Sequence, residues 1–186
     1  MQNKKRSSLN QAPFWRKLYN SPAFRFVLGF ILYLVILGFS YSQLFSRSEK
    51  LRNGFTNLTA QVVGTCYSLT GSKASVAGSL ITAPGVSISV IEECTGAYEM
   101  IIFAGAVLAF PARRLKKLWG ILFGLPLLFI INIIRMWLLA FVQAHGSHQL
   151  FEFMHVYFWQ ATLILMILGV FILWIKLFVY RNVQTV

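Results

Sequence analysis

The residue best suited to covalent chemistry in this chain is Cys94, in the run Glu93-Cys94-Thr95-Gly96. It stands where an alternating, strand-like run gives way to an apolar segment that we expect to form a helix. A thiol at a helix N-terminus meets the positive end of the helix dipole and free backbone N–H groups, which favour the thiolate. The thiolate is the nucleophilic form of cysteine, so the position predicts a nucleophile.

Arg135 and His155 are suitable chemical partners for such a thiol. A Cys–His pair is the minimal constellation for acyl transfer, because the thiolate attacks a carbonyl and the imidazole moves the proton to the leaving amine. A buried Arg lowers the pKa of the thiol or stabilises the oxyanion of the tetrahedral intermediate. Asn132 precedes Arg135 by one helical turn, on the same face, and is expected to orient it.

The composition indicates a polytopic membrane protein. Of the 186 residues, 57% are hydrophobic and 16% are aromatic, which is more than a soluble domain usually carries. The net charge is +12. The basic residues flank apolar segments instead of forming one patch, which predicts contact with anionic lipid headgroups and argues against nucleic acid as a partner.

Four apolar segments are predicted to cross the membrane, at about 24–45, 94–110, 119–142 and 153–178. Each approaches or exceeds the roughly 20 residues needed to cross a bilayer core of about 30 Å. The expected fold class is therefore an all-α polytopic membrane protein. These helices form a single transmembrane domain over residues 24–178.

The basic residues also orient these segments. They cluster in the N-terminal tail 1–23, in the loop 113–117 and near the C-terminal tail 179–186, whereas the loop 143–152 has no Lys or Arg. The positive-inside rule places both tails and the loop 113–117 in the cytoplasm. The segment 46–93 and the loop 143–152 are then expected outside.

This topology brings the three candidate residues to one membrane depth. Cys94 lies at the outer end of the second span and His155 at the outer start of the fourth. Arg135 lies about 22 Å from the inner start of the third span, in the outer third of the membrane. Intramembrane charges are costly, so Arg135 is a functional candidate. Glu99 faces away from Cys94 by helical periodicity and is a candidate ion-pair partner for Arg135.

The outer segment is expected to contain an amphipathic helix and a β-hairpin. Residues 76–81 and 86–90 flank Pro84-Gly85, which is a hairpin signal. From Leu51 to Leu69 apolar residues recur at roughly helical spacing, which predicts a helix lying on the membrane or the bundle: Leu51, Phe55, Leu58 and Val62.

Gly120 and Gly124, in the third span, have the spacing of a helix-packing face.

Other functions stay open for the same polar residues. Arg135 and Glu99 are also compatible with the polar pathway of a small transporter or channel. A non-catalytic membrane scaffold would need neither of them. A Cys66–Cys94 disulfide would favour a thiol oxidoreductase, although the chain has no C-x-x-C pair.

One set of residues has side chains of the types that bind metals. His148, Glu152 and His155 fall at i, i+4 and i+7, which is one face of a helix. The pattern is not H-E-x-x-H, and a solvated helix end explains it more simply. We therefore expect no metal and no other cofactor.

Three of these features together resemble the exosortase/archaeosortase family. They are Glu93-Cys94-Thr95-Gly96 after a strand-like run, Asn132-x-x-Arg135 in the next span, and a His that opens the following span. The resemblance covers about residues 75–165. With fewer spans than typical members, the chain is similar to the compact exosortase H type.

The resemblance implies a cysteine protease and transpeptidase of the bacterial inner membrane, with its active site facing the periplasm. Its partners would be exported proteins that end in a short motif, a hydrophobic helix and a basic cluster. Cys94 would be the nucleophile, Arg135 the transition-state stabiliser and His155 the general acid/base. His155 is preferred to His145 and His148 because it begins an apolar span. Supporting positions would be Asn132, Glu93, Thr95, Gly96 and Glu99.

Overall fold

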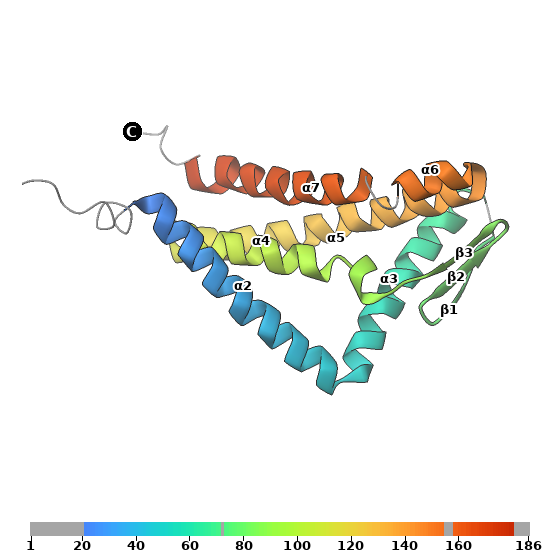
Figure 1. Cartoon of the computed structure of the whole chain (residues 1–186), viewed down its shortest axis with the longest axis horizontal. Coiled ribbons are helices and arrows are strands. Elements are labelled where there is room, and N and C mark those ends of the chain that lie inside the picture. Colours follow the sequence, from blue (N-terminus) through green and yellow to red (C-terminus); the bar gives the residue numbers. More distant parts are fainter. Residues whose placement is uncertain (1–20, 72, 155–157, 181–186) are drawn as a thin grey trace, which may run out of the picture.

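The computed structural model describes residues 21–71, 73–154 and 158–180. In Figure 1, helices α2, α4, α5 and α7 run side by side at one end of the molecule, whereas α3 and a three-stranded sheet lie at the other end. The elements are α2 (Pro22–Arg47), α3 (Glu49–Ser68), β1 (Ser75–Ala77), β2 (Leu80–Ala83), β3 (Val86–Ser89), the 3-10 turn η1 (Glu92–Cys94), α4 (Ala97–Ala109), α5 (Arg114–His145), α6 (His148–Phe153), α7 (Trp159–Trp174) and the π-helical turn η3 (Ile175–Tyr180).

Three helices of the described chain are long and apolar enough to cross a membrane: α2, α5, and α7 with η3. Helix α4 is apolar but has only 13 residues, about 20 Å of helix against a core of about 30 Å. The expected all-α polytopic membrane fold is confirmed. The expected second span at 94–110 is shortened, because its helix begins at Ala97 and not at Cys94.

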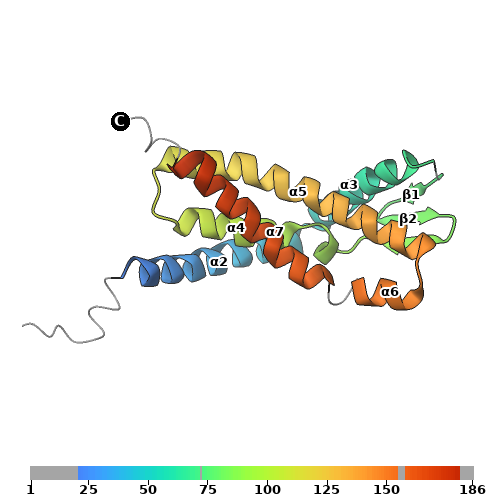
Figure 2. The same ribbon diagram turned by 90° about the horizontal axis from the view of Figure 1, so that it is seen from above.

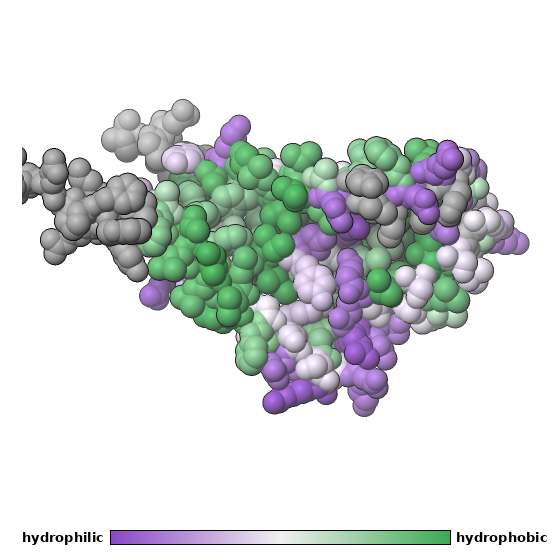
Figure 3. All heavy atoms as spheres, in the orientation of Figure 1, coloured by the Kyte–Doolittle hydropathy of each residue, from purple (hydrophilic) through white to green (hydrophobic). Residues whose placement is uncertain are grey.

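Helix α2 packs on α4 and exposes many apolar side chains on its other side. Ser21 caps α2 by accepting a hydrogen bond from the backbone N–H of Phe24 at 3.2 Å. Pro22 occupies the first turn, where a backbone N–H has no acceptor within the helix, so its missing N–H costs nothing. No residue of α2 is buried. The apolar surface in Figure 3 covers this end of the molecule, as expected of helices that face lipid.

The bundle core forms where α4 and α7 pack on α5. A Cβ atom at Gly120 would collide with the ring of Trp174, and one at Gly124 with the ring of Phe103. The two glycines therefore form the helix-packing face expected from their spacing, since each makes room for a large ring. The indole N–H of Trp174 donates to the backbone carbonyl of Lys116 at 2.9 Å, which joins the start of α5 to the end of α7.

The outer helix α3 matches the expected helix but buries a different face. Leu51 and Leu58 are 48% and 49% exposed. Gly64 packs against the side chain of Val76 in β1, and so close an approach of the sheet selects small residues on the facing side of the helix. The buried face is Thr56, Thr59, Ala60, Val63, Gly64 and Tyr67.

The expected hairpin is part of a three-stranded antiparallel sheet with order β1-β2-β3. Ile81 pairs with both Val76 and Ile88. The run 76–81, expected as one strand, bends at Gly78, whose φ is +64°. That conformation is accessible to glycine and strained for other residues. The bend places Ile81, which is 1% exposed, in the core between the sheet and the helices.

Candidate active site

A tight turn presents Cys94 where the cap, which consists of α3 and the three-stranded sheet, meets the helical bundle. The hydroxyl of Thr95 donates to the carbonyl of Glu92 at 2.6 Å, closing η1. Gly96 follows with a φ of +80° and is the N-cap of α4. A Cβ atom at Gly96 would lie 3.1–3.2 Å from three atoms of the Asn132 side chain. Gly96 thus serves both the left-handed turn and the close approach of α5.

Asn132 joins Cys94 to Arg135. Its side-chain Nδ2 donates to the backbone carbonyl of Cys94 at 2.9 Å. Its Oδ1 accepts from Arg135 Nη1 at 3.3 Å. Asn132 is only 2% exposed, and a buried amide with both ends hydrogen-bonded fixes its neighbours in position. One side chain of α5 therefore sets the register of the Cys94 turn against the guanidinium of Arg135.

Two further side chains hold the guanidinium of Arg135. Glu99 Oε1 lies 3.7 Å from Arg135 Nη1, and each of these side chains is 10% exposed. The Arg135 Cζ lies 5.4 Å from the ring centroid of Trp159, a cation–π distance. Trp159 is 3% exposed and begins α7. The cluster thus draws on α4, α5 and α7.

Trp159 had no place among the residues predicted from the sequence. The signal that would have found it is an aromatic residue at the outer start of a span, at the depth of an intramembrane Arg. Within the described chain, three buried polar atoms of the cluster have no hydrogen-bond partner: Glu99 Oε2, Arg135 Nε and Trp159 Nε1. Buried polar atoms are usually satisfied, so these two donors and one acceptor provide binding capacity for a polar ligand.

The surroundings of the Cys94 thiol differ from the helix-dipole environment expected from the sequence. Cys94 precedes the N-cap Gly96 by two residues, so it lies outside α4. Burial is the largest effect and raises the pKa of Cys94. A backbone hydrogen bond at Ile91 and the charge of Arg135 oppose this and lower the pKa, while Glu93 and Glu99 raise it. The net upward shift means that the thiol needs a base to become nucleophilic.

The predicted general base, His155, lies outside the described residues. His145 is exposed at the end of α5, where its Nδ1 lies 3.2 Å from the carbonyl oxygen of Phe141 and its ring stacks on Phe141 at 4.6 Å. His148 begins α6, which also contains Glu152. The set of His148, Glu152 and His155 therefore lies partly outside the described residues.

The remaining predicted positions have distinct surroundings. Thr95 and Gly96 are buried in the turn, whereas Glu93 is exposed. Cys66 and Cys94 are both free thiols. Both pack against the cap core that contains Val63, so they share an apolar environment without forming the disulfide that the sequence left open.

Comparison with known proteins adds one finding. A family model described as transmembrane exosortase matches residues 18–175. No curated protein and no solved structure matches the chain. The matched range contains the whole cluster around Asn132.

Proposed function

The chain belongs to the transmembrane exosortase family, and on this premise we propose that it is a membrane cysteine peptidase and transpeptidase. It would cleave the C-terminal sorting signal of exported proteins. The observation that carries this proposal is the bridge from the Cys94 carbonyl through Asn132 to Arg135. It holds a thiol-bearing turn in register with a buried cation, which is the requirement of an acyl-transfer site.

The proposed reaction begins with removal of the Cys94 proton by His155. The thiolate attacks the scissile carbonyl, and Arg135 stabilises the oxyanion that forms. As the C–N bond breaks, the proton passes from His155 to the leaving amine, and Cys94 retains the substrate as a thioester. Water, a hydroxyl or an amine then attacks the thioester carbonyl and releases the thiol. The raised pKa of Cys94 supports the need for a base in the first step.

The tail of the substrate is proposed to lie in an apolar groove between α2, α4 and α7. The groove has a volume of about 350 Å³, and its lining includes Phe30, Ala106 and Leu168. Ala106 follows Ala97, the first residue of α4, by nine residues, or about 14 Å of helix, and Cys94 precedes Ala97 by three residues. A hydrophobic helix in this groove would place its outer end near the turn that bears Cys94.

The proposed topology places this turn at the outer face of the inner membrane, with both termini in the cytoplasm. Figure 3 shows hydrophilic residues gathered over the corner between α2 and α3 and around the sheet, and apolar residues over the bundle. The basic residues 113–117, which form the N-cap and first turn of α5 and not the loop expected from the sequence, lie at the opposite end of α5 from this cap. A periplasmic site would meet substrates after their export.

The test is processing of a tagged exported protein that ends in a short motif, an apolar helix and a basic cluster. Cys94→Ala, Arg135→Ala and His155→Ala should each abolish release of the tail. Matched controls are Cys66→Ala and His145→Ala, which should process normally. Membrane abundance is measured for each variant so that misfolding is recognised. Full processing by Cys94→Ala would exclude the mechanism.

A further inference from the structure

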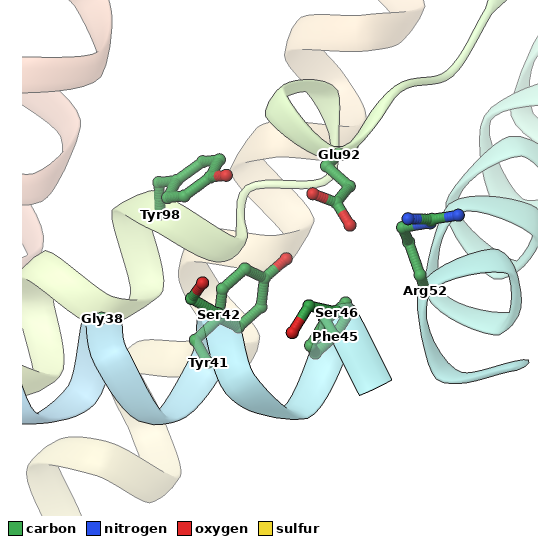
Figure 4. A pocket seen from close by; sticks show the side chains of 8 residues that line it. All are labelled: Gly38, Tyr41, Ser42, Phe45, Ser46, Arg52, Glu92 and Tyr98. Atoms are coloured by element: carbon green, nitrogen blue, oxygen red, sulfur yellow. The ribbon is translucent and has the colours of Figure 1, made fainter. Parts of the chain in front are cut away.

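A second hollow adjoins the Cys94 turn on its outer side. This corner pocket, of about 220 Å³, lies where the end of α2 meets the start of α3 and the turn η1. Figure 4 shows that the carboxylate of Glu92 and the hydroxyls of Tyr41 and Tyr98 turn toward one another across it. The wall is aromatic on the α2 side, where the ring of Tyr41 stacks on Phe45 at 4.1 Å and meets Tyr98 edge-on at 5.7 Å.

The lining of the corner pocket contains one acidic and one basic side chain, Glu92 and Arg52. The protein has 17 basic and only five acidic residues, yet a carboxylate, Glu92, faces this hollow. Among residues 21–71, 73–154 and 158–180, Glu92 forms no salt bridge. The basic residue of the wall, Arg52, is paired with Glu49 of its own helix at 3.4 Å. The carboxylate is thus available to a ligand.

A further polar atom in the same wall is available. The hydroxyl oxygen of Tyr41 is buried and has no hydrogen-bond partner within the described part of the chain. A carboxylate, hydroxyl oxygens and the faces of aromatic rings are the groups that together recognise a cation. The volume suits a small group and is below that of a site for a drug-sized ligand.

We propose that the corner pocket binds the protonated primary amine that acts as acyl acceptor. The amine is the shared chemistry of two sources, a soluble amine and the headgroup of an aminolipid. Glu92 and Cys94 belong to the same one-turn helix, so their Cα atoms lie within about 7 Å. An amine held at Glu92 is therefore within one helical turn of the residue that carries the proposed thioester. The inference rests on the proposed function and names the nucleophile that resolves its intermediate.

Attack of the amine on the thioester needs no further reactant. The bound ammonium gives one proton to the carboxylate of Glu92, which returns it to the solvent. The free amine attacks the thioester carbonyl, forming a C–N bond while the C–S bond breaks. The second amine proton passes to the departing sulfur, so the products are an amide and the Cys94 thiol.

The test measures how the thioester is partitioned between amide and acid. The full chain, in phosphatidylglycerol vesicles, receives the tagged substrate with methylamine; a second set of vesicles contains phosphatidylethanolamine and no methylamine. Mass spectrometry counts methylamide, lipid amide and free acid for each tail released, so any change in the rate of acylation cancels. Glu92→Gln should lower the amide-to-acid ratio about tenfold, as loss of a charge-assisted contact does. Tyr41→Phe should lower it less.

The matched control is Glu152→Gln, which removes an exposed acid on α6, outside the pocket, and should keep the wild-type ratio. An unchanged ratio in Glu92→Gln, or an equal fall in Glu152→Gln, would overturn the assignment. Tail release by the wild type with acid as the sole product in both vesicle sets would also overturn it and leave the proposed peptidase intact. Absence of tail release by the wild type would contradict the proposed function itself. Amide in only one set identifies the source of the amine.

Discussion

The bundle and the outer cap bury different kinds of residue. In the bundle the core consists of large apolar side chains such as Phe103, Leu128 and Trp174, and α2 buries none of its residues. In the cap, α3 buries two threonines, an alanine and a glycine, together with Val63 and Tyr67. The bundle is suited to lipid on its outside, whereas the cap depends on close contact between its own elements.

Helix α5 belongs to both regions, and the change occurs along its length. Gly124 and Leu128 pack in the bundle, while Ile133 and Met136 belong to the cap core. Figure 2 shows α5 running along nearly the whole molecule, with α7 crossing it. The buried polar side chains Asn132 and Glu99 lie at this junction. Within the described chain, the buried carboxylate and amide side chains lie where an apolar bundle meets a tightly packed cap.

The largest expected effect comes from breaking the ion pair at the junction. Arg135→Met leaves the carboxylate of Glu99 buried without its cation, and loss of one partner of a buried pair costs about 3–5 kcal/mol. We expect a large fall in thermal stability in detergent and in membrane abundance. The double variant Arg135→Met with Glu99→Gln should recover most of the stability but not the processing. Equal stability of the single and double variants would contradict a buried pair.

The turn at Gly96 should be the next most sensitive position. Gly96→Ala forces an L-residue into a left-handed conformation, which costs about 1–2 kcal/mol, and its Cβ also displaces Asn132. We expect reduced stability and loss of processing, measured by thermal unfolding and tail release. The control is Gly169→Ala in the bundle, where the added Cβ meets nothing within 4 Å. An equal loss in both variants would show that the turn has no special role.

Filling the groove of the bundle should slow processing without destabilising the protein. Ala106→Trp occupies the space proposed for the substrate tail, and we expect about a tenfold fall in the rate of tail release through misplacement of the substrate. Ile130→Trp is the control, because Ile130 is 54% exposed on α5 and lies outside the groove. Normal release by Ala106→Trp would exclude the groove as the docking site.

The smallest expected effect is a shift in the pH dependence of Cys94 alkylation, measured with iodoacetamide in a Cys66→Ala background. Alkylation should rise with pH as the thiol loses its proton, and burial should move its midpoint above that of an ordinary thiol because it raises the pKa of Cys94. Glu93→Gln removes a negative charge that disfavours the thiolate, so its midpoint should move down. Arg135→Met combined with Glu99→Gln should move it up if the Arg135 charge dominates. A midpoint unchanged in both would contradict the electrostatic account.

Several features of the bundle could be predicted from the sequence because composition and helical spacing determine them. An unbroken apolar run predicts α2, and the spacing of Gly120 and Gly124 predicts a packing face. The contact between Asn132 and Arg135 follows from one turn of helix. These features depend on local geometry and on the bilayer, and neither requires knowledge of tertiary packing.

The details of the cap could not be predicted in this way. The turn at Gly96 separates Cys94 from α4, and the bend at Gly78 divides one expected strand into two. The buried face of α3 is selected by the sheet that packs on it, so the exposure of Leu58 could not be deduced from spacing. The contact of Trp159 with Arg135 joins α7 to α5, and a shared depth makes both residues candidates without specifying that they pair.

The most direct test of the central claim is detection of the acyl-enzyme. The protein is mixed with the tagged substrate, quenched in acid and digested, and the peptide that contains Cys94 is weighed by mass spectrometry. The proposed mechanism predicts a substrate fragment attached to Cys94 that hydroxylamine removes, and none in Cys94→Ala. Tail release with no adduct on Cys94 at any time, or with full activity in Cys94→Ala, would contradict it.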